Sequence, residues 1–168
     1  MRYTRRNVLG MGAMTAAAGL FGLTACSGPA PAAPAAPARR FEVMRTDAQW
    51  REQLSPAAYA VLRRQSTERP YSSPLNKEHR RGTFNCAGCA LPLFSSSTKF
   101  DSGTGWPSFW APLHGAVEED RDTTLGMIRI EAHCRRCGGH LGHVFDDGPR
   151  PTGLRYCMNG VAMSFTAA

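Results

Sequence analysis

The sequence lacks several features that would each place it in a large class of proteins. Its 20 basic residues are interspersed with 13 acidic ones and form no basic stripe, so a pI near 9.5 gives little support to a nucleic-acid partner. The apolar stretch from residue 8 to residue 23 is shorter than the roughly 20 residues of a stable membrane-spanning helix. No βαβ pattern surrounds the cysteines, which disfavours a thioredoxin-like redox protein.

What is present fits one domain with extensions. A chain of 168 residues has the length of a single domain with some residues to spare, and an apolar share of 42% is enough for a core. Part of the formal net charge of +7 comes from residues 1–25, which hold Arg2, Arg5 and Arg6 and no acid.

Residues 1–26 have the pattern of a bacterial export signal. The run from Thr4 to Leu9 contains the twin-arginine pattern, and the apolar stretch follows it. Leu23-Thr24-Ala25-Cys26 resembles the lipobox of bacterial lipoproteins, whose cysteine becomes the lipidated first residue of the mature chain. We therefore expect an exported protein that is anchored to a membrane through Cys26, outside the cytoplasm. An uncleaved amphipathic anchor and a soluble signal cut elsewhere are the alternatives.

Residues 27–40 are expected to form a tether. The run SGPAPAAPAAPA holds four prolines and favours polyproline II, which at about 3.1 Å per residue would reach roughly 35 Å. Such a segment would hold a domain clear of a lipid surface. The globular domain is expected from residue 41 to residue 168.

Two short helices are expected at the start of this domain. Asp47 could cap the first, and Ser55-Pro56 gives the second a Ser N-cap and a Pro at its first position. Beyond Pro70, turn residues separate short runs rich in aromatic and β-branched residues, which predicts a mainly β domain. The expected strands are Thr83–Asn85, Met127–His133, His143–Phe145, Leu154–Met158 and Val161–Thr166.

Four of the six cysteines form two Cys-x-x-Cys pairs and predict a metal site. Cys86 with Cys89, and Cys134 with Cys137, can each place two thiolates on one ion, and four thiolates suit a closed structural zinc site. The 44 residues between the pairs exceed the usual zinc-ribbon spacer of roughly 15–20, so the β domain would have to bring them together. Disulfides are the alternative in an exported protein.

Cys157 is the cysteine that has neither a metal nor a lipid role. Alternate residues of a strand share a face, so Arg155, Cys157 and Asn159 would point the same way. A guanidinium stabilises a nearby thiolate, the form that attacks, and Asn159 can orient a polar substrate group. The alternative is that Cys157 is a small buried apolar residue.

His140-Leu141-Gly142-His143 favours the catalytic interpretation. Two imidazoles close together can deliver a proton to a leaving oxygen near neutral pH. Zinc ligation by His140, three residues after Cys137, is the competing role. Four thiolates already complete a tetrahedral site.

The stretch GTGWPSFW, residues 103–110, is expected to form a rigid aromatic wall. Its glycines allow loop conformations that are closed to other residues, and Pro107 stiffens the loop. Trp106 and Phe109 would face a methyl or thioether group, since sulfur contacts aromatic rings favourably. An ordinary aromatic core under a loop is the alternative.

Together, GTGWPSFW, CRRCGGHLGHVFDDGP, PTGLRYCMNG and the two cysteine pairs resemble the B-type methionine-(R)-sulfoxide reductases. The resemblance covers about residues 41–166 and implies two twisted antiparallel sheets behind a short helical segment. It also implies a structural zinc ion, held by Cys86, Cys89, Cys134 and Cys137.

The same resemblance implies the roles of the site residues. Cys157 would be the nucleophile that attacks the sulfoxide sulfur and becomes a sulfenic acid as methionine leaves. His140, His143 and Asn159 would occupy polar positions of the active site. Trp106 would form the wall against the substrate's ε-methyl group, and Arg155 would lie beside the nucleophile. The expected substrate is oxidised methionine, in exported proteins or free.

Two positions depart from the family pattern. Many relatives carry a resolving cysteine where this chain has Thr104. With the other cysteines assigned to metal or lipid, the expected reductant is an external thiol, from a thioredoxin-like protein or a small molecule. Gly160 stands where serine is commoner, which removes no named chemistry.

Two other classes of function compete with the enzyme. One is a zinc-knuckle module that binds a partner without catalysis, and the other is a nucleic-acid-binding zinc protein. The zinc site suits both, whereas Cys157 with HLGH and GTGWPSF favours the enzyme. The export signal and the scattered charges disfavour the nucleic-acid class.

Overall fold

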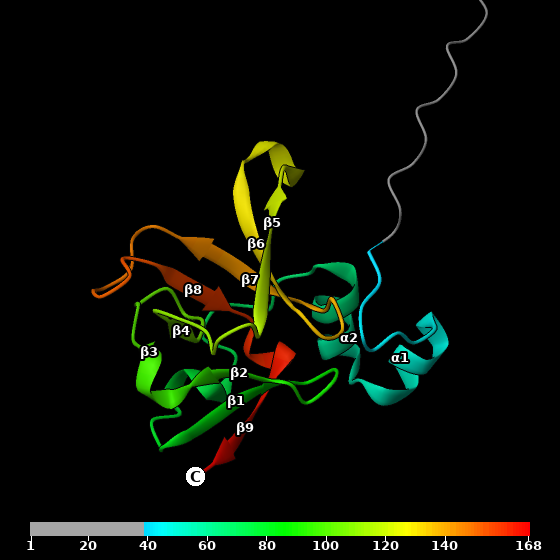
Figure 1. Cartoon of the computed structure of the whole chain (residues 1–168), viewed down its shortest axis with the longest axis horizontal. Coiled ribbons are helices and arrows are strands. Elements are labelled where there is room, and N and C mark those ends of the chain that lie inside the picture. Colours follow the sequence, from blue (N-terminus) through cyan, green and yellow to red (C-terminus); the bar gives the residue numbers. More distant parts are fainter. Residues whose placement is uncertain (1–38) are drawn as a thin grey trace, which may run out of the picture. The chain divides into compact units, whose positions relative to one another are not determined.

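The computed structural model describes residues 39–168. The predicted export signal with Cys26, and residues 27–38 of the predicted tether, lie outside the described residues. The described part forms two α-helices, four short 3₁₀ helices and nine strands, which Figure 1 colours along the sequence. No helix of residues 39–168 is long and apolar enough to cross a membrane.

The first helix, α1 (Asp47–Gln53), begins at a capping box. The Thr46 hydroxyl accepts a hydrogen bond from the Gln49 amide at 3.3 Å, and the Gln49 side chain accepts one from the Thr46 amide at 2.9 Å. The prediction that Asp47 caps this helix is therefore wrong by one residue. Asp47 lies in the first turn, where a negative charge favours the helix dipole.

The second helix, α2 (Pro56–Arg64), confirms the predicted Ser-Pro start. The Ser55 hydroxyl accepts an amide hydrogen from the first turn. Helical spacing brings Tyr59 and Leu62 to one buried face. The helix packs on strand β7 (His140–Phe145), which carries both histidines of HLGH.

The strands form two antiparallel sheets, so the predicted mainly β fold is confirmed. One sheet has the order β2-β1-β9 and the other the order β3-β4-β8-β7-β6-β5, as Figure 1 shows. The strands are β1 (Gly82–Cys86), β2 (Pro92–Ser95), β3 (Lys99–Phe100), β4 (Ser108–Phe109), β5 (Val117–Asp122), β6 (Arg129–Cys134), β7, β8 (Arg155–Met158) and β9 (Met163–Ala167). The 3₁₀ helices are η1 (Pro74–Lys77), η2 (Ser96–Thr98), η3 (Thr124–Gly126) and η4 (Gly160–Ala162).

An aromatic core joins the two sheets. Phe84 of β1, Phe94 of β2 and Phe109 of β4 are fully buried. The Phe94 and Phe109 rings stack with centroids 4.3 Å apart, and Phe84 meets Phe109 edge-on at 4.9 Å. Such pairs contribute about 0.5–1.5 kcal/mol each beyond the burial of their area. The core thereby fixes β4, and with it the neighbouring β8, against the smaller sheet.

Strands β5 and β6 extend beyond the rest of their sheet as an arm (Figure 1). They pair over their whole length, from Val117 opposite Cys134 to Asp122 opposite Arg129. β5 has the sequence VEEDRD, a charged run that no apolar alternation marks as a strand. The arm brings Asp122 of β5 and Glu131 of β6 into contact with the histidines of β7.

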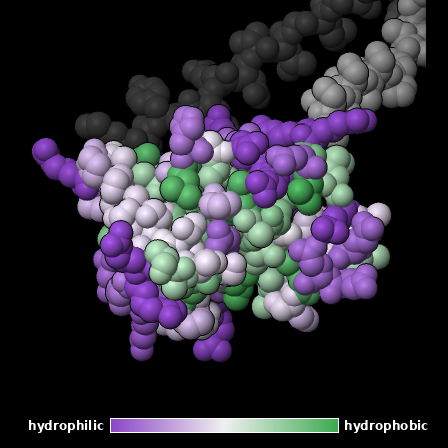
Figure 2. All heavy atoms as spheres, turned by 60° about the horizontal axis from the view of Figure 1, so that its bottom comes forward, coloured by the Kyte–Doolittle hydropathy of each residue, from purple (hydrophilic) through white to green (hydrophobic). Residues whose placement is uncertain are grey.

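Polar and apolar side chains are unevenly spread over the surface. Figure 2 shows one face on which strongly polar side chains gather towards the rim, with pale and apolar ones between them. In the described part, large apolar side chains that stay exposed include Met127, Ile128 and Ile130 of the arm. The arm therefore carries both acidic and apolar side chains.

Candidate active site and metal centre

Cys157 lies in the middle of the larger sheet. Its strand β8 runs between β4 and β7, and Cys157 is directly opposite Ser108 and His143. Directly opposed residues of an antiparallel sheet share a face, so these three side chains point to the same side. Tyr156 and Met158 are buried on the other side, in the core.

A cavity of about 150 Å³ opens beside the half-buried Cys157 thiol. It lies between the segment after α2, the Trp106 loop and the strands β6, β7 and β8. Its lining residues are Thr67, Trp106, Arg129, Gly142, His143, Phe145, Cys157 and Asn159. At roughly 30 Å³ per water molecule, the space suits a small group at the end of a side chain.

The close approach of β7 and β8 beneath this cavity depends on Gly142. A Cβ at this position would collide with the Cys157 carbonyl oxygen. Glycine therefore permits the pairing that sets His143 opposite Cys157.

Arg155 is a fixed cation near the sulfur. It is 8% exposed, and its Nε and Nη2 donate to the two Asp147 carboxylate oxygens at 2.7 Å each. Its guanidinium carbon lies 4.3 Å from the centroid of the Phe145 ring. The hydrogen bonds to Asp147 raise the pKa of Arg155, and negative charge on Cys157 acts in the same direction.

His143 is the imidazole that reaches the cavity. Its Nε2 lies 2.9 Å from Asp122 Oδ2, and the same oxygen accepts a hydrogen bond from Arg129 Nη2 at 2.6 Å. Burial lowers the pKa of His143, although the Asp122 contact acts upward. Hydrogen bonds from Thr124, followed by those from His143 and Arg129, lower the pKa of Asp122. Asp122 is therefore an ionised carboxylate that orients the His143 ring.

His140 does not line the Cys157 cavity but lies next to His143, which does. Its Nδ1 is 2.7 Å from Glu131 Oε1, and its ring centroid is 5.3 Å from that of His143. It lines an adjoining polar cavity of about 260 Å³, which does not include Cys157. Burial raises the pKa of Glu131, but the hydrogen bond and charge of His140, followed by contributions from His133 and Gln65, outweigh it, and the net change is downward. The structure thus brings His143 to the sulfur and places His140 against His143.

The Asn159 side chain is already engaged by the protein. Its Nδ2 donates to the Leu141 carbonyl at 3.0 Å, and its Oδ1 accepts the Glu68 amide hydrogen at 2.9 Å. One of the two amide hydrogens thus ties Asn159 to β7. The second hydrogen stays available, and the residue holds the cavity wall together.

Glu68 fixes the opposite wall. Its carboxylate accepts the amide hydrogens of Gly160 and Val161 at 2.5 and 3.0 Å, and its carbonyl accepts the Trp106 indole hydrogen at 3.1 Å. The Trp106 loop is thereby bound to the turn after β8. A Cβ at Gly160 would collide with the Ser73 side chain, so glycine is a packing requirement in this chain.

The predicted aromatic wall is only partly correct. Trp106 lines the cavity, but Phe109 is 0% exposed and stacks on Phe94 in the core. Phe109 follows Ser108 in β4, and strand alternation turns it away from the face that Cys157 shares with Ser108. The second aromatic side chain of the cavity is Phe145, two residues after His143 on the same strand.

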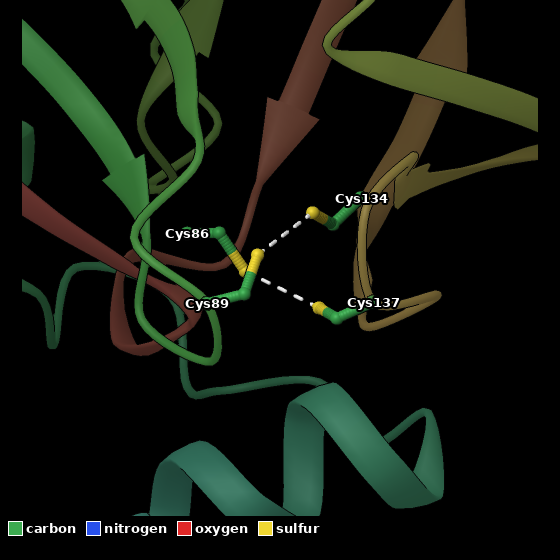
Figure 3. A group of neighbouring side chains, drawn as sticks. All are labelled: Cys86, Cys89, Cys134 and Cys137. Atoms are coloured by element: carbon green, nitrogen blue, oxygen red, sulfur yellow. Dashed lines mark hydrogen bonds between the residues drawn. The ribbon is translucent and has the colours of Figure 1, made fainter. Parts of the chain in front are cut away.

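A second cluster of sulfurs lies outside this cavity (Figure 3). It consists of Cys86, Cys89, Cys134 and Cys137. The two knuckles close in the same way, with the Ala90 amide bonded to the Cys86 carbonyl and the Gly138 amide to the Cys134 carbonyl, both at 2.8 Å. Ala90 and Gly138 both have positive φ, which tightens each turn so that its two sulfurs point inward.

The geometry of this cluster fits a tetrahedral metal ion. All four Sγ atoms lie within 4.8 Å of one another, with Cys86 and Cys137 3.7 Å apart and Cys89 and Cys134 3.5 Å apart. Bonds of about 2.3 Å to one ion would set tetrahedral sulfurs roughly 3.8 Å apart. The four are free cysteines, so the disulfide alternative is not supported. His140, the other alternative ligand, is paired with Glu131.

The acidic partners of the site were not predicted from the sequence. Asp122 and Glu131 lie on the arm, and Glu68 follows α2, so no short motif joins them to Cys157. Phe145, another cavity residue that was missed, could have been predicted, because alternation places it on the same face of its strand as His143.

Comparison with known proteins assigns the chain to a family. The family model described as the SelR domain matches residues 54–167. The chain belongs to the SelR family. The SelR match begins at the end of α1, so α1 itself precedes it.

Several SelR-family relatives are closely similar over the whole domain. The peptide methionine sulfoxide reductase MsrB of Thiobacillus denitrificans is 59% identical over 122 residues, which cover 72% of this chain and 92% of that protein. The protein of the same name from Agrobacterium fabrum is 56% identical over 125 residues, or 74% and 93% of the two chains. The one from Bradyrhizobium diazoefficiens is 56% identical over 123 residues, or 73% and 88%.

Proposed function

We propose that this domain reduces methionine-(R)-sulfoxide to methionine with electrons from a thiol. The observation that carries the proposal is the setting of Cys157, a half-buried thiol that faces a small cavity with His143 directly opposite. The relatives named peptide methionine sulfoxide reductase MsrB cover the same domain at 56–59% identity. These observations favour an enzyme over a non-catalytic zinc module.

The proposed chemistry begins with attack by the Cys157 sulfur on the sulfoxide sulfur. The sulfoxide oxygen takes up a proton and is transferred to Cys157, and methionine leaves as the thioether. The substrate sulfur gains two electrons and Cys157 loses two, becoming a sulfenic acid. Arg155 stabilises the attacking thiolate, and His143, oriented by Asp122, is the proton donor nearest to the oxygen.

The cavity wall suits selection of one epimer. Trp106 and Phe145 offer apolar ring faces to the ε-methyl group, while His143 offers hydrogen bonding to the S=O group. In the other epimer the oxygen and methyl exchange places, so an unpaired oxygen would meet the aromatic rings. His140 and Asn159 act by holding His143 and the wall in position.

We propose zinc as the ion of the four-cysteine cluster. Four thiolates are the donor set of closed structural zinc sites, and none of the four lines the Cys157 cavity. The ion would supply folding free energy and no catalytic step.

The oxidised enzyme needs a reductant from outside the domain. Among the residues that line the cavity, Cys157 is the only cysteine, and Thr104 stands beside it with a hydroxyl. An external thiol would condense with the sulfenic acid to a mixed disulfide and water, and a second thiol would release Cys157. A thioredoxin-like protein or a small thiol fits this role.

We also propose that the protein works outside the cytoplasm, attached to a membrane. The support is the sequence of residues 1–26, with its twin-arginine pattern and a lipobox-like Cys26. A lipidated Cys26 has no free thiol, which is consistent with an external reductant. Mass determination of the mature N-terminal peptide tests this, since an unmodified Cys26 would contradict it.

A turnover assay with separated epimers tests the proposed reaction. The purified full chain is given the R or the S epimer of a methionine sulfoxide peptide, together with dithiothreitol or a thioredoxin-like protein. Only the R epimer should be consumed, and Cys157→Ser should abolish this while it keeps the metal. Consumption of the S epimer, or an active Cys157→Ser, would overturn the assignment. An intramolecular disulfide found by mass spectrometry after turnover would overturn the external-reductant step.

A further inference from the structure

A chain of three hydroxyl groups ends at the Cys157 sulfur. Thr104 Oγ1 lies 3.6 Å from Cys157 Sγ and 2.8 Å from Ser102 Oγ, and Ser102 Oγ lies 2.7 Å from Ser108 Oγ. Ser108 is fully buried and directly opposite Cys157 in the sheet. The reaction described above uses none of these hydroxyls.

The hydrogen bonds of this hydroxyl chain all donate in one direction, which is set at the buried end, Ser108. Ser108 Oγ lies 3.1 Å from the Trp106 carbonyl oxygen, and a carbonyl can only accept, so the single Ser108 proton is used there. Ser102 must then donate to Ser108, and Thr104 to Ser102. Thr104 therefore faces the sulfur with lone pairs, which can accept a hydrogen bond from a thiol but not give one to a thiolate.

We propose that this hydroxyl chain controls how readily Cys157 gives up its proton, given the proposed role of Cys157 as the nucleophile. In the thiol state every link of the chain is made. In the thiolate state Thr104 must turn its proton to the sulfur, and Ser102 keeps only the Thr104 amide as a donor, at 3.4 Å. The thiolate thus gains a donor at the cost of one internal hydrogen bond.

Charged groups also face Cys157 from the neighbouring elements. Arg155 lies on its own strand, His143 on β7 is paired with Asp122, and Arg129 reaches the cavity from β6. On the other sides, β4 presents the neutral Ser108 and the segment after α2 presents the neutral Thr67. The next residue of that segment, Glu68, is charged, and its carboxylate is held by the amides of Gly160 and Val161. These charges act on Cys157 regardless of which way the hydroxyls point. Substitutions of the hydroxyl residues can therefore separate the effect of the hydroxyl chain on the thiol from the effect of the charges.

Alkylation of Cys157 by iodoacetamide in the full chain tests the proposal. The reagent reacts with the thiolate, so the rate at a pH below the plateau follows the thiolate fraction, and peptide mass mapping isolates Cys157. Thr104→Val removes both the donor to the thiolate and the acceptor of the thiol hydrogen, and the charge-assisted contact to the thiolate is the stronger of the two. This substitution should slow alkylation by roughly threefold to tenfold and move the half-maximal pH upward. Thr104→Ser keeps the hydroxyl and should behave like wild type.

Substitutions of the two serines of the hydroxyl chain should change the alkylation rate in the opposite direction. Ser108→Ala frees the Ser102 proton for Thr104, and hence the Thr104 proton for the sulfur, so alkylation should become roughly two- to fivefold faster. Ser102→Ala removes the acceptor of the Thr104 proton and should have the same effect. Because Ser102 is only half-buried, this variant tests the proposal even if Ser108→Ala does not fold.

The signs together decide the outcome. Slower alkylation of Thr104→Val with faster alkylation of Ser102→Ala supports the proposal, and any other combination overturns it. Ser97→Ala, in the exposed Ser95–Ser97 hydroxyl pair at 2.8 Å, is a matched control that should change nothing. Alkylation needs no turnover, so these signs in a protein that reduces neither epimer would overturn the proposed function alone.

Discussion

The domain has two sulfur sites that are built in opposite ways. The metal centre gathers four cysteines around one point, and Cys86, Cys134 and Cys137 are each at most 2% exposed. The Cys157 cavity holds one half-buried cysteine among ion pairs, hydroxyls and amides. A bound ion would coordinate all four sulfurs of the cluster and leave them unreactive, whereas Cys157 lies outside the cluster and faces a cavity.

This difference separates stability from chemistry. At the metal centre one ion would connect two knuckles from different sheets, so the loss of a single ligand would affect the whole fold. At the cavity each contact is made by a different pair of residues, such as Asp122 with His143 or Asp147 with Arg155. Substitutions there should change reactivity while the fold remains.

Loss of the metal should have the largest effect. Structural zinc contributes about 10–16 kcal/mol of apparent binding free energy, which is comparable to the whole stability of a domain, about 5–15 kcal/mol. Cys134→Ser, or treatment with a strong chelator, should therefore abolish the cooperative thermal transition measured by circular dichroism. The matched control is Cys157→Ser, which should melt like wild type with its metal content intact.

The metal centre was also the part that the sequence predicted best. Each Cys-x-x-Cys knuckle is a local structure with its own turn geometry. A motif of four residues therefore predicts half of the metal site before any tertiary contact is known. Cys157, His143 and Trp106 could be predicted for a similar reason, because they lie in short motifs.

The acidic residues that hold the cavity could not be predicted in this way. Asp122 lies on a strand without apolar alternation, and it meets His143 only because β5, β6 and β7 pair side by side. Phe109 was misplaced because its face depends on where β4 begins, and a strand of two residues has no readable period. Tertiary pairing decides both cases.

Asp122→Asn should show the next largest effect, on catalysis. It removes the carboxylate that orients His143 and binds Arg129, and kcat/KM should fall about tenfold to a hundredfold. Burial would then lower the pKa of His143 without the opposing carboxylate. If activity needs a protonated His143, its decline with rising pH should shift to lower pH. The pH profile of kcat/KM measures both changes.

Asp120→Asn is the matched control for this variant. Asp120 lies on the same strand and pairs with a different histidine, His133, at 3.0 Å, away from the cavity. Its pH profile should be that of wild type. Equal losses in both variants would mean that the arm matters only as a whole, and that Asp122 has no specific role.

Thr104→Cys should supply a resolving cysteine next to Cys157. Thr104 Oγ1 is 3.6 Å from Cys157 Sγ, so a small rotation of a cysteine side chain could reach the bonding distance of about 2.05 Å. After one turnover without reductant, mass spectrometry should detect a disulfide between positions 104 and 157. Thr104→Ser should form none. Absence of the disulfide in Thr104→Cys would show that the cavity keeps these two positions apart.

Asp147→Asn should have the smallest effect of the series, because the Asp147 side chain of its pair with Arg155 is 60% exposed and solvent screens the interaction. The loss should be at most about 1 kcal/mol in the free energy of unfolding at pH 7. Arg155 lowers the pKa of Asp147, so the pair stabilises the fold above the ordinary aspartate pKa of about 3.9. The difference from wild type should disappear as the pH falls below that value and through the lowered pKa of Asp147. Urea unfolding at several pH values measures it, with Asp146→Asn as the neighbouring control. A loss as large as that of Cys134→Ser would mean that the cavity, like the metal centre, depends on a single contact.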